Sequence, residues 1–329
     1  MGRTSTLIWS KYVIAFTALA VFTLRISADP VVNVLTQGSQ FGKMDLATGT
    51  FTPIGPIPAT IQYLVPAPNG PLLTMSFNGD LDSIDRATGA TTVIGPTGFG
   101  DCSTPASPCG PNSQLSFGTA GGIVYATDFA NNLYTVNPAT GKATLVGATG
   151  IPAVPFVPAS TNPDGSFNFY DENLFDVGAK LYANFDAGTF NPATGVFTTA
   201  IPAALYQIDA ATGHASEVAS TDFGLVTVFN LNGTIYGFGG LPGQIVTLNP
   251  ADGTTTFVSN IDPSVGLIGG VAPAVPEPAS IALLGIAILC AVFYRSRRYL
   301  QKSFFAPTFN YAREEFATCS LDRNYRWRP

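Results

Sequence analysis

Residues 133–146 read LYTVNPATGKATLV. Apolar residues alternate on both sides of a short polar centre, which is the pattern of two strands joined by a tight turn. In the centre, the Asn137 side chain can accept hydrogen bonds from backbone amides two residues further on, and Pro138 fixes φ. Gly141 closes the turn because glycine tolerates a positive φ. The stretch therefore predicts an antiparallel β-hairpin.

This turn recurs along the chain as a five-residue pattern. The first position is Asp or Asn, the second is any residue, the third is Ala, the fourth is either Thr or Asp, and the fifth is Gly. Each copy predicts a structural turn rather than a ligand site. A second hairpin, marked by glycine and an aromatic residue, precedes most copies, as in GAKLYA at residues 178–183. Each unit then holds four short strands, and four-stranded units that recur about every 40–50 residues are typical of an all-β propeller. The six copies begin at Asp45, Asp85, Asn137, Asn191, Asp209 and Asn249.

The ring is expected to contain five blades, with six or seven as the alternatives. The copy at residues 191–195 ends only 18 residues before the end of the next one, so it is interpreted as an extra hairpin between the second and third strands of its unit. The first unit, residues 31–55, has room for three strands, and residues 265–273 (VGLIGGVAP) resemble a lone inner strand after the last unit. Joining the two would close the ring and leave no exposed sheet edge.

The first 28 residues read as a secretory signal. Arg3 and Lys11 form a basic region, an apolar run covers residues 12–24, and residues 26–28 (ISA) offer a small-residue cleavage site. The apolar run of 13 residues would span about 20 Å as a helix, which is short for a bilayer core of about 30 Å. We therefore expect a signal helix at 1–28 that is cleaved, and a retained N-terminal anchor is the alternative.

A second topogenic segment lies near the C-terminus. Residues 275–280 (VPEPAS) precede an apolar run that is followed directly by arginines. Residues 279–294 are predicted to form a transmembrane helix, and the arginines would stay on the cytoplasmic side under the positive-inside rule. The ectodomain, residues 29–274, would then lie outside the inner membrane. The residues that define this segment are Pro276, Glu277, Pro278, Arg295, Arg297 and Arg298.

Pro-Glu-Pro, an apolar helix and an arginine cluster in this order resemble the PEP-CTERM sorting signal of Gram-negative bacteria. The resemblance implies that residues 275–298 are recognised and processed by exosortase, a membrane protease-transpeptidase. It also implies passage through the secretion translocon, anchoring in the membrane, and then delivery to the cell surface or extracellular matrix. The family signal normally ends soon after the arginines, whereas here residues 299–329 follow. They are interpreted as a cytoplasmic tail without a function of its own, or as translation past an ancestral stop.

Charge and composition exclude several classes of function. The chain has a formal net charge of −6, but residues 29–274 hold only four basic residues against 17 acidic ones, a net charge of −13. Nucleic acid is therefore an implausible partner. His214 is the only histidine, which excludes multi-histidine metal sites, and we expect it to face solvent because it follows a repeated turn. No phosphate-binding loop, dinucleotide fingerprint, nucleophile elbow or HExxH motif occurs, so no catalytic residue is assigned.

Long connections are expected on the face opposite the repeated turns, at residues 97–113, 148–172 and 186–203. Long loops on one face of a rigid scaffold are where binding usually resides. The loop 162–176 (NPDGSFNFYDENLFD) combines acids with aromatic rings, which suits calcium or the face of a sugar. The alternative is a set of solvated acids in a loop packed by its own aromatic rings. The acids are Asp164, Asp171, Glu172 and Asp176.

Two further expectations concern smaller features of the predicted propeller. Cys102 and Cys109 are expected to form a disulfide in an oxidising, exported compartment, with two free thiols as the alternative. Asp80 and Asp82 alternate along a predicted strand and are interpreted as an exposed polar edge.

The leading hypothesis is a non-enzymatic, exported propeller without a cofactor. By its resemblance to the PEP-CTERM family, it would act in the exopolysaccharide or biofilm matrix and bind extracellular polysaccharide or serve as a structural module. The alternative is a calcium-dependent hydrolase or lyase that acts on extracellular glycans or esters.

Overall fold

The computed structural model describes residues 30–274 apart from short gaps. The gaps are 59–60, 68–70, 101–112, 153–161, 163, 192, 195, 223, 240–242 and 267. The expected signal peptide, the sorting signal with its helix 279–294, the tail and the Cys102–Cys109 pair all lie outside the described residues. Among the residues that are described, no helix is long and apolar enough to cross a membrane.

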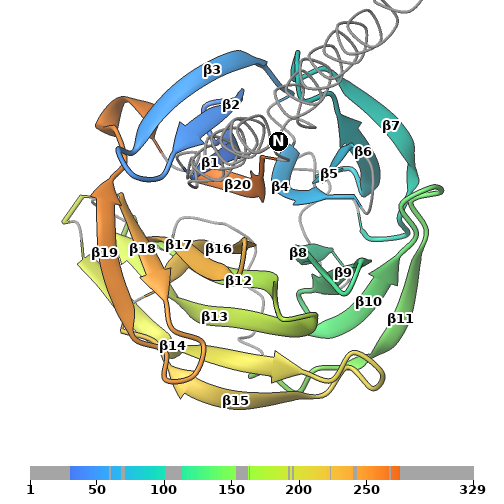
Figure 1. The fold of residues 1–329 in the computed structure, drawn as a ribbon. Helices are drawn as coiled ribbons and strands as arrows, with labels where there is room; N and C mark the ends of the chain where they lie inside the picture. Colours follow the sequence, from blue (N-terminus) through green and yellow to red (C-terminus); the bar gives the residue numbers. More distant parts are fainter. Residues whose placement is uncertain are drawn as a thin grey trace, which may run out of the picture. The chain divides into compact units, whose positions relative to one another are not determined.

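Twenty strands in the described part form five four-stranded antiparallel sheets, arranged as blades around a central axis (Figure 1). This confirms the predicted all-β propeller with five blades. From the inside outwards, blade 1 contains β20 (Ile268–Pro273), β1 (Val31–Thr36), β2 (Gln40–Asp45) and β3 (Thr50–Pro56), and blade 2 contains β4 (Ile61–Pro66), β5 (Leu72–Ser76), β6 (Asp80–Ile84) and β7 (Thr91–Pro96). Blade 3 contains β8 (Gln114–Ala120), β9 (Ile123–Asp128), β10 (Asn132–Val136) and β11 (Ala143–Ala148). Blade 4 contains β12 (Phe167–Val177), β13 (Lys180–Asn191), β14 (Val196–Ile208) and β15 (Ala215–Ser220), and blade 5 contains β16 (Leu225–Leu231), β17 (Thr234–Gly239), β18 (Gln244–Leu248) and β19 (Thr255–Asn260).

The ring closes through the strand that follows the last blade. β20 pairs antiparallel with β1, as predicted for residues 265–273. On the outer side of the closure, the Ser259 hydroxyl donates a hydrogen bond to the Leu46 carbonyl oxygen at 2.7 Å. From blade 2, Arg86 Nη1 donates to the Pro273 carbonyl oxygen at 3.3 Å. Blade 1 is therefore built from both ends of the described chain.

The repeated turns have the structure that the sequence predicts. Asn137 Oδ1 accepts a hydrogen bond from the Ala139 amide at 2.9 Å, and the Gly141 amide donates to the Asn137 carbonyl oxygen at 2.9 Å. Gly141 has a φ of 81°. In the other five copies the alanine amide likewise donates to the Asp or Asn side chain. His214, which follows one of these turns, is exposed.

Neighbouring blades are also joined at their outer strands, by a contact that the sequence analysis missed. A Cβ added to Gly213, in the turn of blade 4, would lie only 2.8 Å from the Gly147 carbonyl oxygen at the end of β11. Directly after β11, the Thr149 carbonyl oxygen accepts a hydrogen bond from the Ala215 amide at 2.8 Å. The stretch GATG that contains Thr149 has a counterpart in blade 2, GPTG at residues 95–98. This second repeat is the signal that could have revealed the contact.

Apolar side chains fill the spaces between successive blades. Phe175 of blade 4 stacks on Tyr182 with ring centroids 6.0 Å apart, and both belong to a cluster that includes Leu225 of blade 5. Between blades 2 and 3, Phe99 and Tyr134 pack edge to face at 5.0 Å. Because both faces of each blade are buried in this way, the inner strands form a fixed wall around the axis.

Blade 4 differs from its sequence-based interpretation. The turn at residues 191–195 joins β13 to β14, which are both long, so residues 186–203 extend these strands instead of forming a loop. Residues 167–176 likewise belong to the inner strand β12 and not to a loop. Asp and Glu are depleted in strands, yet here Asp171, Glu172 and Asp176 lie on β12, which pairs along its length with β13.

Asp82 is also placed differently from the sequence interpretation. It lies on β6 and is only 5% exposed. Because β7 pairs along the outer side of β6, this strand is not an edge of its sheet. Asp80, at the start of β6, is half-buried, and its carboxylate accepts a hydrogen bond from the Asn78 side-chain amide at 2.9 Å.

Candidate functional site

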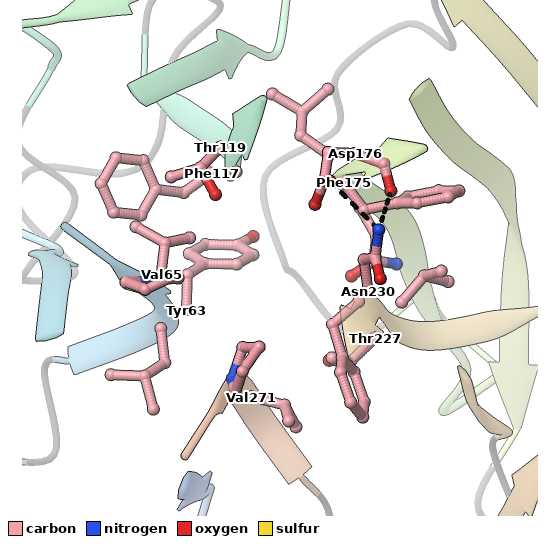
Figure 2. Close-up of a pocket in the computed structure, with 18 of the residues that line it drawn as sticks. Tyr63, Val65, Phe117, Thr119, Phe175, Asp176, Thr227, Asn230 and Val271 are labelled. Carbon is pink, nitrogen blue, oxygen red and sulfur yellow. Dashed lines mark hydrogen bonds between the residues drawn. The ribbon is translucent and has the colours of Figure 1, made fainter. Parts of the chain in front are cut away.

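A hollow lies on the propeller axis, and all five inner strands contribute to its wall (Figure 2). Its empty volume is about 520 Å³. Most of the lining side chains are apolar or aromatic, but more of the surface that faces the hollow is polar than apolar. The lining residues include Tyr63 from β4, Phe117 from β8, Phe175 and Asp176 from β12, Asn230 from β16 and Gly270 from β20.

Tyr63 is directed into the hollow by an irregularity of β4 (Figure 2). The β4–β5 register shifts between Gln62 and Val65, and Tyr63 has a φ of 64°. A bulky residue in this region is strained by about 1–3 kcal/mol, and such strain concentrates at functional sites. The Thr74 hydroxyl donates to the Tyr63 carbonyl oxygen at 2.8 Å, and the Tyr63 hydroxyl donates to the Leu115 carbonyl oxygen of blade 3. The conformation is therefore held from both ends of the residue.

The neighbouring inner strand leaves room for this unusual backbone. A Cβ added to Gly270 of β20 would lie 2.6 Å from the Tyr63 carbonyl carbon and 2.7 Å from the Leu64 amide nitrogen. Only glycine permits such a close approach of two backbones. Blades 1 and 2 thus meet at the point where Tyr63 enters the hollow.

Asp176 and Asn230 form a polar pair on the side of the hollow opposite Tyr63 (Figure 2). The Asn230 side-chain amide donates to the Asp176 backbone oxygen at 3.2 Å and to its carboxylate Oδ2 at 3.1 Å. The Gly233 amide donates to Asn230 Oδ1 at 2.8 Å, which fixes the orientation of the Asn230 amide. Burial raises the pKa of Asp176, and the hydrogen bond from Asn230 opposes that increase.

The structure separates the four acids that were expected to share a ligand. Asp164 is exposed in a turn, where its carboxylate accepts the Ser166 amide at 3.0 Å. Asp171 and Glu172 lie in the first half of β12, whereas Asp176 lies near its end, at the hollow. Within the described ranges, no three His, Cys, Asp or Glu side chains are close enough together to hold a metal ion.

Asp171 and Glu172 instead lie on opposite faces of the blade, because successive side chains of a strand alternate. Asp171 faces Asp186, which lies directly opposite it in the β12–β13 register, whereas Glu172 lies near Thr127 and Asp128 of blade 3. Glu172 is 3% exposed and neither of its carboxylate oxygens has a hydrogen-bond partner, and Asp186 Oδ1 is also buried without one. Burial raises the pKa of Asp171 to about 7, and it raises the pKa of Glu172 and of Asp186 to about 8.

Asp171 and Glu172 lie close enough to the hollow for their charges to act on Tyr63. Burial raises the pKa of the Tyr63 hydroxyl, and the charges of Asp171 and Glu172 raise it further. Asp186 was missed by the sequence analysis. Its signal is a lone acid inside the otherwise largely apolar stretch YANFDAG, residues 182–188.

The chain runs from the last inner strand, β20, directly into a further recognisable segment. Residues 274–298 match the PEP-CTERM protein-sorting motif. The PEP-CTERM motif implies processing by exosortase, and proteins that carry it are exported and sorted to the membrane or cell surface. The chain thus joins a five-bladed propeller to a PEP-CTERM protein-sorting motif. A comparison with curated protein sequences gives no match.

Several solved structures match this chain at low sequence identity and with TM-scores below 0.5. A chain from the nidogen/laminin complex is 11% identical with a TM-score of 0.43, and the match covers 74% of this chain and 98% of that one. The PQQ-bound aldose sugar dehydrogenase of Streptomyces coelicolor is 14% identical with a TM-score of 0.36, covering 66% and 86%. A structural genomics protein of Bacteroides thetaiotaomicron is 15% identical with a TM-score of 0.41, covering 71% and 56%. At this level of similarity the matches carry no information about ligand or activity.

Proposed function

We propose that this PEP-CTERM propeller is a non-enzymatic binding or structural module of the extracellular polysaccharide matrix. The observation that carries the proposal is the position of the sorting motif, residues 274–298, immediately after the strand that closes the ring. A complete propeller therefore precedes the processing region. The axial hollow gives this module a place for a small ligand, and the excess of acids in residues 29–274 argues against nucleic acid as a partner.

The proposal is tested by following the full chain in a host with exosortase and in the same host without it. With exosortase, the protein should be recovered with the extracellular matrix and should be shorter than the full chain. The double variant Pro276→Ala, Pro278→Ala should stay in the membrane fraction at full length. Pro53→Ala, Pro56→Ala is the matched control, because both prolines are exposed on β3, and it should behave like the unchanged protein. Retention of the unchanged protein in the cytosol, or its absence from the matrix, would overturn the proposal.

The buried acids favour one second candidate. Carboxyl groups whose pKa is strongly raised are typical of sites that carry out acid–base chemistry, and Asp171, Glu172 and Asp186 are such groups. This candidate is a hydrolase or lyase that acts on extracellular glycans or esters, although the described residues offer no calcium site for it. Turnover of a glycan and ester panel that is lost in Glu172→Gln would support it. Binding of polysaccharide without turnover supports the non-enzymatic function.

A further inference from the structure

We propose that the axial hollow binds a small cationic ligand, a primary ammonium group carried by a sugar ring or a short chain, with Asp176 as its counter-charge and Tyr63 as its aromatic wall. The proposal rests on the matrix function only for the natural source of this ligand, which we infer to be an amino sugar. The chemistry of the hollow itself follows from the residues that line it.

The charge of the hollow points to a cation. Asp176 is the only ionisable acid or base other than Tyr63 among the described lining residues. Arg86 donates to the Pro273 carbonyl oxygen but does not line the hollow. A half-buried carboxylate with a neutral hydrogen-bond donor, Asn230, gains most from a ligand that brings a positive charge, because a charge-assisted bond is stronger than a neutral one. An anion would instead meet both Asp176 and the net charge of −13 on residues 29–274.

The irregular backbone of β4 places the Tyr63 ring where it can contact a ligand in the hollow. Its positive φ lies within the register shift of β4, and Gly270 of β20 closely approaches the same stretch of backbone. Strained residues persist only where the surroundings hold them, and here Thr74 and Leu115 do so through hydrogen bonds. An aromatic ring suits both parts of the proposed ligand, since it attracts an ammonium group and packs on the apolar face of a sugar.

The size of the hollow limits the ligand to a single small unit. Its empty volume of about 520 Å³ includes space that is open to solvent, so the enclosed part has room for no more than one small unit. The Asp176–Asn230 pair and the Tyr63 ring lie on opposite sides of this space (Figure 2). One ligand can therefore contact the carboxylate and the ring at the same time.

The first arm of the test is calorimetric titration of the full chain in detergent with a matched set of sugars. Glucosamine carries the ammonium group, N-acetylglucosamine is its neutral counterpart, and glucuronic acid carries an anion. We expect glucosamine to bind, N-acetylglucosamine to bind at least about tenfold more weakly, and glucuronic acid not to bind. Equal affinity for the first two sugars would overturn the proposal. Ethanolamine tests the source of the ammonium group: weaker binding than glucosamine supports an amino sugar, and equal binding rejects the amino-sugar source.

The second arm uses two variants of the hollow and one control. Asp176→Asn keeps the shape of the side chain and should abolish glucosamine binding. Asp80→Asn is the control, because the Asp80 carboxylate also accepts a hydrogen bond from an asparagine amide but does not line the hollow. This variant should bind glucosamine as tightly as the unchanged protein. Tyr63→Asn removes the ring with a residue that tolerates a positive φ, and it should weaken binding at least about tenfold.

Each variant is checked for folding by its thermal unfolding temperature, so that a loss of binding is counted only when the fold is retained. If Tyr63→Asn does not fold, the glucosamine affinity of Asp176→Asn alone tests the proposal. Full glucosamine affinity in Asp176→Asn would overturn the proposal. Matrix recovery of Asp176→Asn is measured separately: if it is normal while the unchanged protein does not bind glucosamine, the ligand inference fails and the matrix function stands.

Discussion

At the scale of single residues, the glycine of the repeated turn is required for two separate reasons. Gly213 has a φ of 84°, and an added Cβ would also lie 2.8 Å from the Gly147 carbonyl oxygen of the preceding blade. Gly122 has a similar φ of 79° but no neighbour within 4 Å of an added Cβ. Substitutions at these two glycines therefore separate the energetic cost of backbone strain from the cost of disturbing the contact between neighbouring blades.

We expect Gly122→Ala to lower the free energy of unfolding by about 1–2 kcal/mol, which is the strain of a left-handed alanine. Gly213→Ala should lower it by about 1–3 kcal/mol more, because the neighbouring backbone has to move. Urea unfolding of both variants measures the difference. Equal losses would show that the turn does not pack against the preceding blade.

The buried acids predict a pH dependence of stability. The pKa values of Glu172 and Asp186 are raised from their ordinary values of 4.5 and 3.8 to about 8, and that of Asp171 to about 7. Between about pH 5 and pH 8 the folded state therefore holds protons that the unfolded state has released. Stability should fall as the pH rises through this window, by about 1.4 kcal/mol per pH unit for each such proton.

The measurement is the free energy of unfolding in urea at pH 5, 6.5 and 8. Glu172→Gln replaces the carboxyl with a neutral group of the same shape, so its stability should depend less steeply on pH than that of the unchanged protein. Asp164→Asn, which changes an exposed acid, should leave the slope as it is. If the free energy of unfolding rises from pH 5 to pH 8, burial does not raise the pKa values of these carboxyl groups in the folded state.

At the scale of elements, β20 is the strand on which closure of the ring depends. A chain that ends at Ala274 keeps β20, whereas a chain that ends at Asp262 lacks it and leaves an edge of β1 unpaired. An unpaired inner strand is a template for association with other chains. We expect the longer form to be monomeric with a cooperative unfolding transition, and the shorter form to aggregate or to unfold without a sharp transition. Size-exclusion chromatography and thermal unfolding compare them, and identical behaviour would show that β20 is dispensable.

The sequence was most informative about elements that repeat and least informative about blade 4. The Asp or Asn side chains and the glycines of the turns act through local hydrogen bonds, so the turns and the number of blades could be predicted from the chain alone. The hollow could not, because Tyr63, Asp176 and Asn230 come from three blades and meet only when the ring closes. The acids of β12 were assigned to a loop, since nothing local indicates that β13 and a neighbouring blade bury Glu172.

At the scale of the whole molecule, the ring ends just before the sorting motif begins. β20 ends at Pro273 and the motif covers residues 274–298. Cleavage within the motif therefore leaves every strand of the propeller in place. We expect the processed protein and the full-length precursor to have the same thermal unfolding temperature in the same detergent. A lower unfolding temperature after processing would show that residues beyond Pro273 support the fold.

The pairing of β1 with β20 joins the first and the last strands of the described chain. During synthesis from the N-terminus, β1 has to wait until almost the whole ectodomain has been made before its partner exists. The sorting motif is made immediately afterwards. A polypeptide that stops before β20 thus lacks both the strand that completes the ring and the signal for processing, so the complete fold and the sorting signal are made together.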